Sequence, residues 1–430
     1  MTSETLAVNG GTPVRSGEFP PYVSMGEDEV AAVQEVVRSQ CLSGYYGSWG
    51  PEFLGGPQVK AFEHAWAVRF RVKHVVSVNS ATSGLFAAIG AAGVGPGDEV
   101  IVPPYTMSAT AMAPLVYGGI PVFADIEADT FCLDIEDVRA KITPRTKAVM
   151  VVNLFGHPGR LHDLRKLCDE KGLVLIEDNA QGPLAEEDGK MAGTIGHIGI
   201  FSLNYHKHIH TGEGGMCATD DDQLALKMQM IRNHAENIVD HVDLPNIVNM
   251  VGFQYRMTEL SAAVGLQQLA HADRHIGVRQ RIAERLSDGL RDLEGVTVPI
   301  VREGCRHVYY VWAAKLDEQA LGVDRAAFSR ALTAEGFPHW TGYVAPLYRL
   351  PLFKKKVAFG EGGYPFNLSD VEYRDGMCPV TERMHDHELL GFETCAFALT
   401  DANLDHLVEA FRKVHRMRHT IHSETRVGAH

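Results

Sequence analysis

Three features are scarce in this sequence: paired cysteines, long apolar runs and positive charge. The seven cysteines are scattered over 430 residues and none is spaced as Cys-x-x-Cys, so we expect reduced thiols and no disulfide framework. No apolar run approaches the length of a membrane span, so we expect no membrane partner. A net charge of −14 at pH 7 argues against nucleic acid, whose binding needs a basic face.

The opening residues and the overall composition are those of an ordinary globular protein. Met1 to Thr5 contain no basic segment followed by an apolar one, so we expect no signal peptide and a cytoplasmic location. Apolar residues make up 45% of the chain and charged residues 22%, which suits a large folded core.

Short apolar segments alternate with helical patterns over most of the chain, as in an α/β fold with a mostly parallel sheet between two layers of helices. After about Thr297 the strands become shorter, which predicts a smaller α+β domain. The expected domains are an N-terminal arm (1–25), a large α/β domain (26–296) and a small C-terminal domain (297–430). The expected strands are Val75–Val78, Glu99–Val102, Val122–Asp125, Lys147–Asn153 and one from Val174, and the expected helices include Ser83–Ala92 and Arg160–Lys171.

Lys207 follows a short buried strand and precedes a glycine-rich turn. The apolar run Ile198–Phe201 predicts the strand, and the turn Gly212–Gly215 lets backbone come close to a ligand. A lone lysine is usually a solvated surface charge. In this setting, however, its amine could hold the aldehyde of pyridoxal phosphate (PLP) as a Schiff base.

Asp178 ends the apolar run that starts at Val174, and Gln181 lies just beyond it. A carboxylate at the carboxyl end of a parallel strand stands where ligands bind in open α/β sheets. PLP chemistry needs such an acidic partner for the pyridine nitrogen. Taken alone, Asp178 would more often be a helix cap or a turn residue.

The segment Asn79–Ser83 joins an expected strand to an expected helix. A helix N-terminus offers free amides and the positive end of a dipole, so it attracts phosphate, and the hydroxyl of Thr82 would add to this. Helix capping by Ser or Thr is the common alternative. Ser202 is either a buried strand hydroxyl or a further phosphate ligand.

Three histidines, His206, His208 and His210, surround Lys207. If the segment is extended, period-two alternation places them together on one face. Three imidazoles could bind zinc with an open position, as in a zinc-dependent hydrolase. Structural or substrate-facing histidines are commoner in such runs, so we expect no metal.

In their order and spacing these motifs resemble those of the PLP-dependent sugar aminotransferase family of the DegT/StrS type, which has aminotransferase fold type I. The resemblance covers nearly the whole chain. It implies a homodimer whose active sites are shared between subunits. It rests on Asn79–Thr82, Gly97–Pro103, Glu177–Gln181, Phe201–Lys207, Thr211–Gly215 and Gly252–Met257.

The resemblance also implies a role for each matching residue. Lys207 would carry the cofactor and move protons, Asp178 would pair with the pyridine nitrogen, and Gln181 would touch the phenolic oxygen. The segment Gly252–Met257 would reach the partner's cofactor. The phosphate would be held by Ala81, Thr82 and Ser202.

Three positions depart from the family's usual pattern. Ala81 replaces a glycine, Gln254 replaces an asparagine that contacts the phosphate, and Met107 replaces an aromatic ring that covers the cofactor. A thioether is soft and polarisable, so we expect Met107 to cover the ring instead. One member group has histidine at the lysine position and performs a dehydration, so Lys207 favours transamination.

We therefore expect an aminotransferase that moves an amino group from glutamate or glutamine to a keto sugar or a keto cyclitol, with pyridoxamine phosphate as the intermediate cofactor form. Such reactions serve aminosugar, aminocyclitol, nucleotide-sugar and antibiotic biosynthesis. A sugar dehydratase of the same family and a non-enzymatic regulator on the same fold are the alternatives. The segments Asn9–Arg15 and Leu42–Gly44 favour the cyclitol branch. Candidate polyol contacts are Tyr45, Trp49, His206, His208, His210 and Tyr343.

Overall fold

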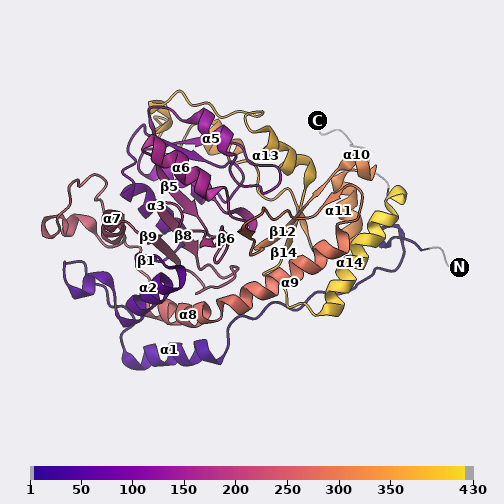
Figure 1. Ribbon diagram of the computed structural model, residues 1–430, viewed down its shortest axis with the longest axis horizontal. Coiled ribbons are helices and arrows are strands. Elements are labelled where there is room, and N and C mark those ends of the chain that lie inside the picture. Colours follow the sequence, from indigo (N-terminus) through magenta and orange to yellow (C-terminus); the bar gives the residue numbers. More distant parts are fainter. Residues whose placement is uncertain (1–3, 422–430) are drawn as a thin grey trace.

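Seven strands form the central sheet of the larger domain in the computed structural model, which describes residues 4–421 (Figure 1). They are β1 (His74–Val78), β2 (Glu99–Val102), β3 (Ile120–Phe123), β4 (Thr146–Val152), β5 (Val174–Asp178), β8 (Ile198–Ser202) and β9 (Gly215–Thr219). Their order is β1-β9-β8-β5-β4-β2-β3. All neighbouring pairs are parallel except those of β9, which runs antiparallel to both β8 and β1. The expected mostly parallel sheet is confirmed.

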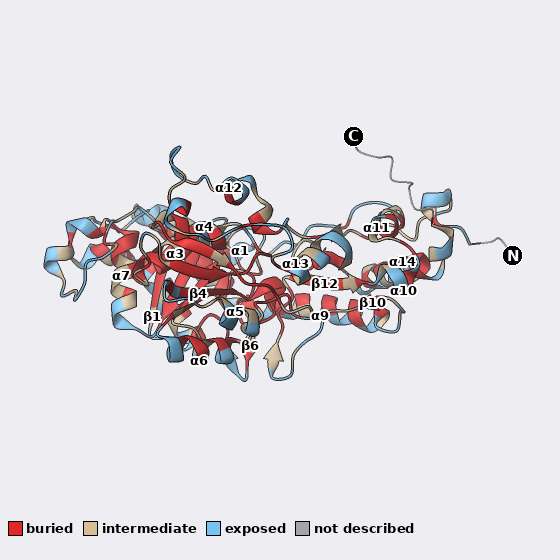
Figure 2. Ribbon diagram, turned by 90° about the horizontal axis from the view of Figure 1, so that it is seen from above, coloured by how far each residue is buried: buried red, intermediate tan, exposed pale blue. Residues whose placement is uncertain are grey.

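Helices cover both faces of this sheet, which is why its strands are apolar along nearly their whole length (Figure 2). The helices of one face are α2 (Pro57–Phe70), α5 (Ile135–Lys141), α6 (Leu161–Lys171) and α8 (Glu259–Ala270), whose apolar side chains form one core with the strands. Those of the other face are α3 (Ala81–Ala91), α4 (Ala109–Val116) and α7 (Asp222–Arg232). Helix α1 (Glu27–Ser39) packs outside α8.

An antiparallel sheet forms the second domain, in the order β10-β12-β14-β13. Its strands are β10 (Val296–Thr297), β12 (Val311–Leu316), β13 (Trp340–Thr341) and β14 (Leu389–Glu393). Its helices are α10 (Glu318–Leu321), α11 (Arg325–Ala334), α13 (Pro379–Arg383) and α14 (Asp401–Arg416), whereas α12 (Pro351–Lys354) packs on the first domain. A small third sheet joins β6 (Glu186–Glu187), β7 (Lys190–Met191) and β11 (Cys305–Arg306).

The predicted boundary between the two domains at residue 296 stays a prediction. Side-chain packing crosses it in both directions. Leu6 and Phe19 of the N-terminal arm belong to the core of the second domain. The long helix α9 (Ala272–Leu290) runs from one domain to the other (Figure 1). Conversely, Leu347 and Tyr373 pack into the core of the first domain. The two domains are therefore tied together by the arm, by α9 and by the segment 347–378.

Most of the expected elements are present within one to three residues. Helices α8 and α9 are separate, because the chain leaves helical geometry at His271. Within residues 4–421 no helix combines the length and the apolar character needed to cross a bilayer.

Candidate active site

The carboxyl ends of three parallel strands open onto a cavity of about 250 Å³, which we call the strand-end cavity. β4, β5 and β8 end there in Val152, Asp178 and Ser202, and α3 begins beside them after β1. Ligand sites of open α/β sheets lie at this edge. The predicted site residues that line the cavity are Ala81, Thr82, Met107, Asp178, Gln181, Ser202, His206, Lys207 and Tyr343.

Alternation along β5 separates two neighbouring carboxylates. Asp178 faces the cavity, where the Thr110 hydroxyl donates to its Oδ2 at 2.9 Å. Glu177 lies on the opposite face, fully buried, and accepts hydrogen bonds from three backbone amides of the loop 193–196. Burial raises the pKa of Asp178, against the lowering effects of the Thr110 hydrogen bond and the Lys207 charge. Of the two carboxylates, only Asp178 can meet a ligand.

Lys207 stands in a turn beyond β8, where its backbone amide donates to the Asn204 carbonyl at 3.0 Å. Its Nζ lies 4.2 Å from the centre of the Tyr310 ring. Burial lowers the pKa of Lys207 to about 8, although the Asp178 carboxylate acts in the opposite direction. A lysine with a lowered pKa has a larger neutral, nucleophilic fraction at neutral pH.

The N-terminus of α3 faces the same cavity. Ser80 caps the helix by accepting from the Ser83 amide at 3.1 Å, and the amides of Ala81 and Thr82 have no intrahelical acceptor. Gly215 packs directly on this turn, since a Cβ there would lie 2.7 Å from the Ala81 nitrogen. The free amides, the helix dipole and the Thr82 hydroxyl suit a phosphate group.

Three further residues of this site carry no signal in the sequence: Asn204 and Tyr310 line the cavity, and Thr110 bonds Asp178. Each gains its place only through the fold. The Asn204 side-chain nitrogen donates to the Glu213 carboxylate at 2.8 Å, while its Oδ1 is buried with no hydrogen-bond partner in residues 4–421. A buried acceptor of this kind calls for a donor on a ligand.

Gln181 bridges two parts of the chain at the cavity wall. Its Oε1 accepts from the Phe155 amide at 2.7 Å, and its Nε2 donates to the Tyr343 hydroxyl at 3.1 Å. Met107 lies at the cavity mouth and is 61% exposed, so its thioether is free to cover a bound ring.

Five predicted site residues lie outside this cavity: Tyr45, Trp49, Gln254, and the histidines His208 and His210 that are described below. Tyr45 is buried in the core, with its hydroxyl 3.4 Å from the Ser77 Oγ, so it is a packing residue. Trp49 lies on the surface. Gln254 borders the phosphate turn from behind, where its backbone carbonyl accepts from the Asn79 side chain at 3.5 Å.

The three histidines around Lys207 diverge, because the segment is a turn and period-two alternation does not apply to it. His206 lines the cavity, whereas His208 is fully buried against the Val308 carbonyl, 2.9 Å away. His210 bonds a serine hydroxyl of the N-terminal arm at 2.7 Å. No group of three His, Cys, Asp or Glu side chains is placed to hold a metal ion in the described part of the chain. The zinc interpretation therefore loses its geometric basis.

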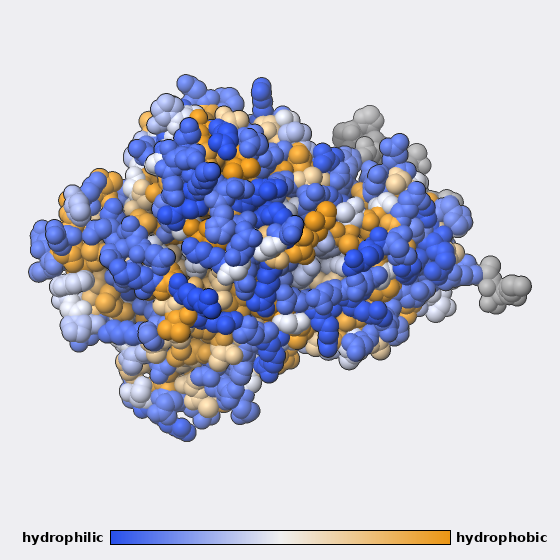
Figure 3. Space-filling view, in the orientation of Figure 1, coloured by the Kyte–Doolittle hydropathy of each residue, from blue (hydrophilic) through white to orange (hydrophobic). Residues whose placement is uncertain are grey.

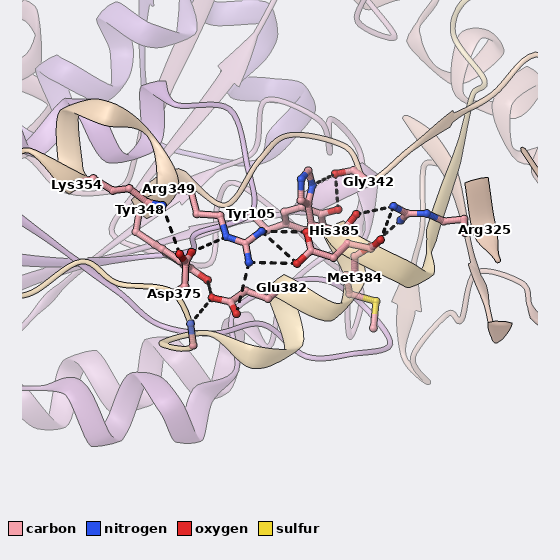
Figure 4. A network of polar contacts seen from close by, with 12 residues as sticks. Tyr105, Arg325, Gly342, Tyr348, Arg349, Lys354, Asp375, Glu382, Met384 and His385 are labelled. Carbon is pink, nitrogen blue, oxygen red and sulfur yellow. Dashed lines mark hydrogen bonds and ion pairs between the residues drawn. The ribbon is translucent and has the colours of Figure 1, made fainter. Parts of the chain in front are cut away.

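A polar network with residues from both domains holds the backbone at Gly342, next to Tyr343, in place (Figure 4). Both residues have left-handed backbone, with φ of +75° and +43°. The Gly342 carbonyl accepts from the Tyr105 hydroxyl at 2.9 Å and from the His385 ring. Arg325 donates to the His385 carbonyl at 2.8 Å and to neighbouring carbonyls, which fixes the turn that presents the histidine.

Arg349 ties this turn to the segment that packs on the first domain (Figure 4). Its guanidinium lies 3.0 Å from Asp386, 2.9 Å from Asp375 and 3.6 Å from Glu382. Tyr348 donates to Glu382 at 2.6 Å. The position of the Tyr343 ring in the cavity thus depends on contacts from both domains.

We expect Gly342→Ala to destabilise the protein more than Gly322→Ala. Both glycines have left-handed backbone, which costs about 1 kcal/mol for alanine. A Cβ at Gly342 would also lie 2.6 Å from the His385 carbonyl oxygen, whereas nothing lies within 4 Å at Gly322. Overpacking adds about 1–3 kcal/mol. Denaturant unfolding of the two variants measures the difference, and equal losses of stability would contradict the tight packing at Gly342.

Residues 24–389 match the model of the DegT/DnrJ/EryC1/StrS aminotransferase family. The chain belongs to this family. It is 34% identical over 432 residues to the L-glutamine:2-deoxy-scyllo-inosose aminotransferase of Streptomyces kanamyceticus, with 96% of this chain and 97% of that protein covered.

Two solved structures extend the comparison. One is DesI in the presence of its TDP-sugar product, with a TM-score of 0.79, 29% identity, and 96% and 98% of the two chains covered. The other is the E. coli GDP-4-keto-6-deoxy-D-mannose-3-dehydratase with bound hydrated PLP, with a TM-score of 0.77, 25% identity, and 92% and 100% covered.

This family member is a PLP-dependent aminotransferase of fold type I, as the sequence motifs predicted. The strand-end cavity fits PLP. The amides at the start of α3 suit its phosphate, and Asp178 lies at the end of β5, where it can face the pyridine nitrogen. Lys207 is the one lysine among the cavity residues of the described chain. The unpartnered Asn204 Oδ1 offers an acceptor that a bound group can use.

Proposed function

We propose that this aminotransferase moves the amino group of L-glutamine to a free keto cyclitol of the 2-deoxy-scyllo-inosose type. The observation that carries the proposal is the end-to-end match with an enzyme named for that reaction. A keto sugar linked to a nucleotide is the rival acceptor, which the similarity to DesI keeps open. Glutamate is the rival donor.

In this proposal five residues of the strand-end cavity bind the cofactor or move protons. PLP, when bound, supplies an electron sink for the carbanion formed at the amino carbon. Lys207 holds the cofactor and its freed amine moves a proton between the substrate and the cofactor. Asp178 keeps the pyridine nitrogen protonated. Ala81, Thr82 and Ser202 bind the phosphate.

The proposal also names the residues that would contact the cofactor's ring and its phenolic oxygen. Gln181 would contact the phenolic oxygen, and the exposed Met107 would cover the ring of the bound cofactor. Gln254 lies outside the strand-end cavity of its own subunit, and in the proposed dimer the segment Gly252–Met257 would instead reach the partner's cofactor. A dehydratase is the weaker candidate because Lys207 occupies the position where that member group carries histidine.

The two half-reactions can be followed in the visible spectrum of the purified protein. We expect L-glutamine to bleach the absorbance band of the bound cofactor, and a keto cyclitol to restore it. Restoration only by a nucleotide-linked keto sugar would replace the proposed acceptor. A protein that stays colourless after PLP is added would refute PLP binding itself.

The rate at which cofactor-free protein captures PLP should rise about tenfold per pH unit up to about pH 8 and then level off. The reason is that only the neutral Lys207 amine reacts, and burial lowers the pKa of Lys207 to about 8. In Asp178→Asn the midpoint should move to lower pH, because the carboxylate raises that pKa. A rate that keeps rising to pH 10 would contradict the buried setting of the amine.

We also propose a homodimer in the cytoplasm. Exposed apolar side chains gather on the loop after α7, where Ile247, Val248 and Val251 are 62%, 49% and 66% exposed, and Val30 and Val37 of α1 are about half exposed. Figure 3 shows orange patches at the α7 end and over the region of α1 and α8. Burying them against a second copy would remove this apolar surface from water. All seven cysteines are free, which suits a reducing compartment.

Sedimentation at micromolar concentration tests the dimer. We expect Val248→Asp with Val251→Asp to shift the wild-type dimer to monomer, because two buried carboxylates would have no partner. Val68→Asp is a matched control, since Val68 is 65% exposed on α2. Monomeric wild-type protein would contradict the proposal.

A further inference from the structure

A second cavity, of about 510 Å³, adjoins the strand-end cavity, and we call it the rim cavity. Residues from four distant parts of the chain form it: the N-terminal arm, the turn before Lys207, the start of β12 and the end of β14. The side chains that matter here are those of Tyr22, Tyr205, His206, Tyr310, Glu393 and Cys395. His206 and Tyr310 line both cavities, so a molecule in the rim cavity lies beside Lys207.

Two polar groups of the rim cavity are free to meet a ligand. In the described part of the chain, neither the Glu393 carboxylate nor the Tyr205 hydroxyl makes a hydrogen bond to another residue. Tyr205 is 69% exposed and Glu393 is also exposed. The Tyr22 hydroxyl, in contrast, is already bonded to His275 at 2.7 Å. The Glu393 carboxylate can therefore offer both of its oxygens as acceptors to a ligand in the rim cavity.

Negative charge dominates the lining of the two cavities. Asp178, Glu213 and Glu393 line them, and Lys207 is the only lysine or arginine of residues 4–421 that does. Burial and the Lys207 charge lower the pKa of His206 to about 4, so its ring is neutral at pH 7. The phosphate of PLP adds further negative charge.

One buried cation stands behind the wall of the rim cavity. Arg279 is 1% exposed, with its guanidinium 3.7 Å from the centre of the Tyr22 ring and its Nε 3.5 Å from the Cys395 Sγ. Those two side chains separate it from the cavity. It cannot form the bidentate contact that phosphate oxygens favour.

We propose that the rim cavity binds an uncharged polyhydroxy ketone, and that Glu393 selects it by accepting hydrogen bonds from its hydroxyl groups. A carboxylate can accept from two neighbouring hydroxyls, and these charge-assisted bonds are stronger than neutral ones. The Tyr205 and Tyr310 rings offer apolar faces for the C–H side of the polyol ring. A nucleotide diphosphate would instead meet Glu393 with like charge. This selection rests on the proposed function and names the residue that decides the acceptor class.

The test measures binding apart from turnover. The wild-type holoenzyme and the variants Glu393→Gln and Glu303→Gln are titrated calorimetrically with myo-inositol and with myo-inositol monophosphate. Glu303 is an exposed glutamate outside both cavities, so its variant controls for the loss of one negative charge. We expect Glu393→Gln to weaken myo-inositol binding roughly tenfold or more. The ratio of its affinity for myo-inositol to its affinity for the monophosphate should be smaller than in the wild type. Glu303→Gln should match the wild type.

Equal affinities of wild type and Glu393→Gln for myo-inositol would overturn the assignment, and so would tighter wild-type binding of the monophosphate. Steady-state kinetics are measured in a separate experiment. We expect Glu393→Gln to raise KM for the keto cyclitol with kcat nearly unchanged, and to leave the L-glutamine half-reaction unslowed. If the titrations behave as expected but no keto cyclitol is aminated, the proposed function fails while the polyol site stands.

Discussion

Lys207→Ala should lose turnover by roughly 10⁴-fold or more, because no other lysine lines the strand-end cavity in residues 4–421. The variant should remain folded, since the change removes a cation that burial disfavours. Steady-state assays with L-glutamine and a keto cyclitol measure the loss. Retained turnover with the same substrates would remove Lys207 from the mechanism.

Two further measurements separate a lost proton carrier from a damaged site. Added methylamine should restore part of the rate in Lys207→Ala, because a small amine can enter the space left by the side chain. Lys73→Ala is the matched control, since Lys73 lies on the surface and pairs with Asp222. It should keep the wild-type rate, and amine should have no effect on it.

Asp178→Asn should lower kcat by roughly 10²- to 10⁴-fold while PLP stays bound. An amide cannot stabilise a protonated pyridine nitrogen, but the phosphate cradle at the start of α3 is untouched. The amide oxygen can keep accepting from the Ala180 amide, and the Thr110 hydroxyl can turn to accept from the new NH2 group, so the local packing is kept. Stopped-flow measurement of the L-glutamine half-reaction reports the loss, and a near-normal rate would refute the electrostatic role.

The neighbouring carboxylate provides an internal comparison. Glu177→Gln should leave the rate per folded molecule near that of the wild type but reduce stability by about 2 kcal/mol or more, because its oxygens accept from three backbone amides. Asp178→Asn should show the reverse pattern. Unfolding curves and rates measured together distinguish the two, and a similar pattern in both variants would contradict their opposite placement on β5.

The sequence was most informative where function depends on local order along the chain. Strand ends carry Asp178 and Ser202, a strand-to-helix turn carries Thr82, and a glycine-rich turn follows Lys207. Each of these signals comes from a short segment, and parallel strands bring their ends to one edge of the sheet without further information. Burial on both faces likewise makes the central strands readable as apolar runs.

Contacts between distant segments could not be derived in this way. Thr110 meets Asp178 because the start of α4 lies at the end of β5, and Tyr310 covers Lys207 because the second domain folds back onto the first. The predicted histidine face failed for the same reason. His208 turns into the core and His210 toward the arm because the chain bends after β8, and period-two alternation holds only in extended backbone.

The sequence by itself determined the fold class and the family, and it pointed to the lysine and the carboxylate to which we assign the cofactor chemistry, since these follow from ordered local motifs. Only the tertiary structure decided which polar groups share a cavity. It separated Asp178 from Glu177, placed Tyr45 in the core, and brought Glu393 beside Tyr205 at the rim. The physical reason is that a side chain's burial and its partners are set by packing between segments far apart in the sequence.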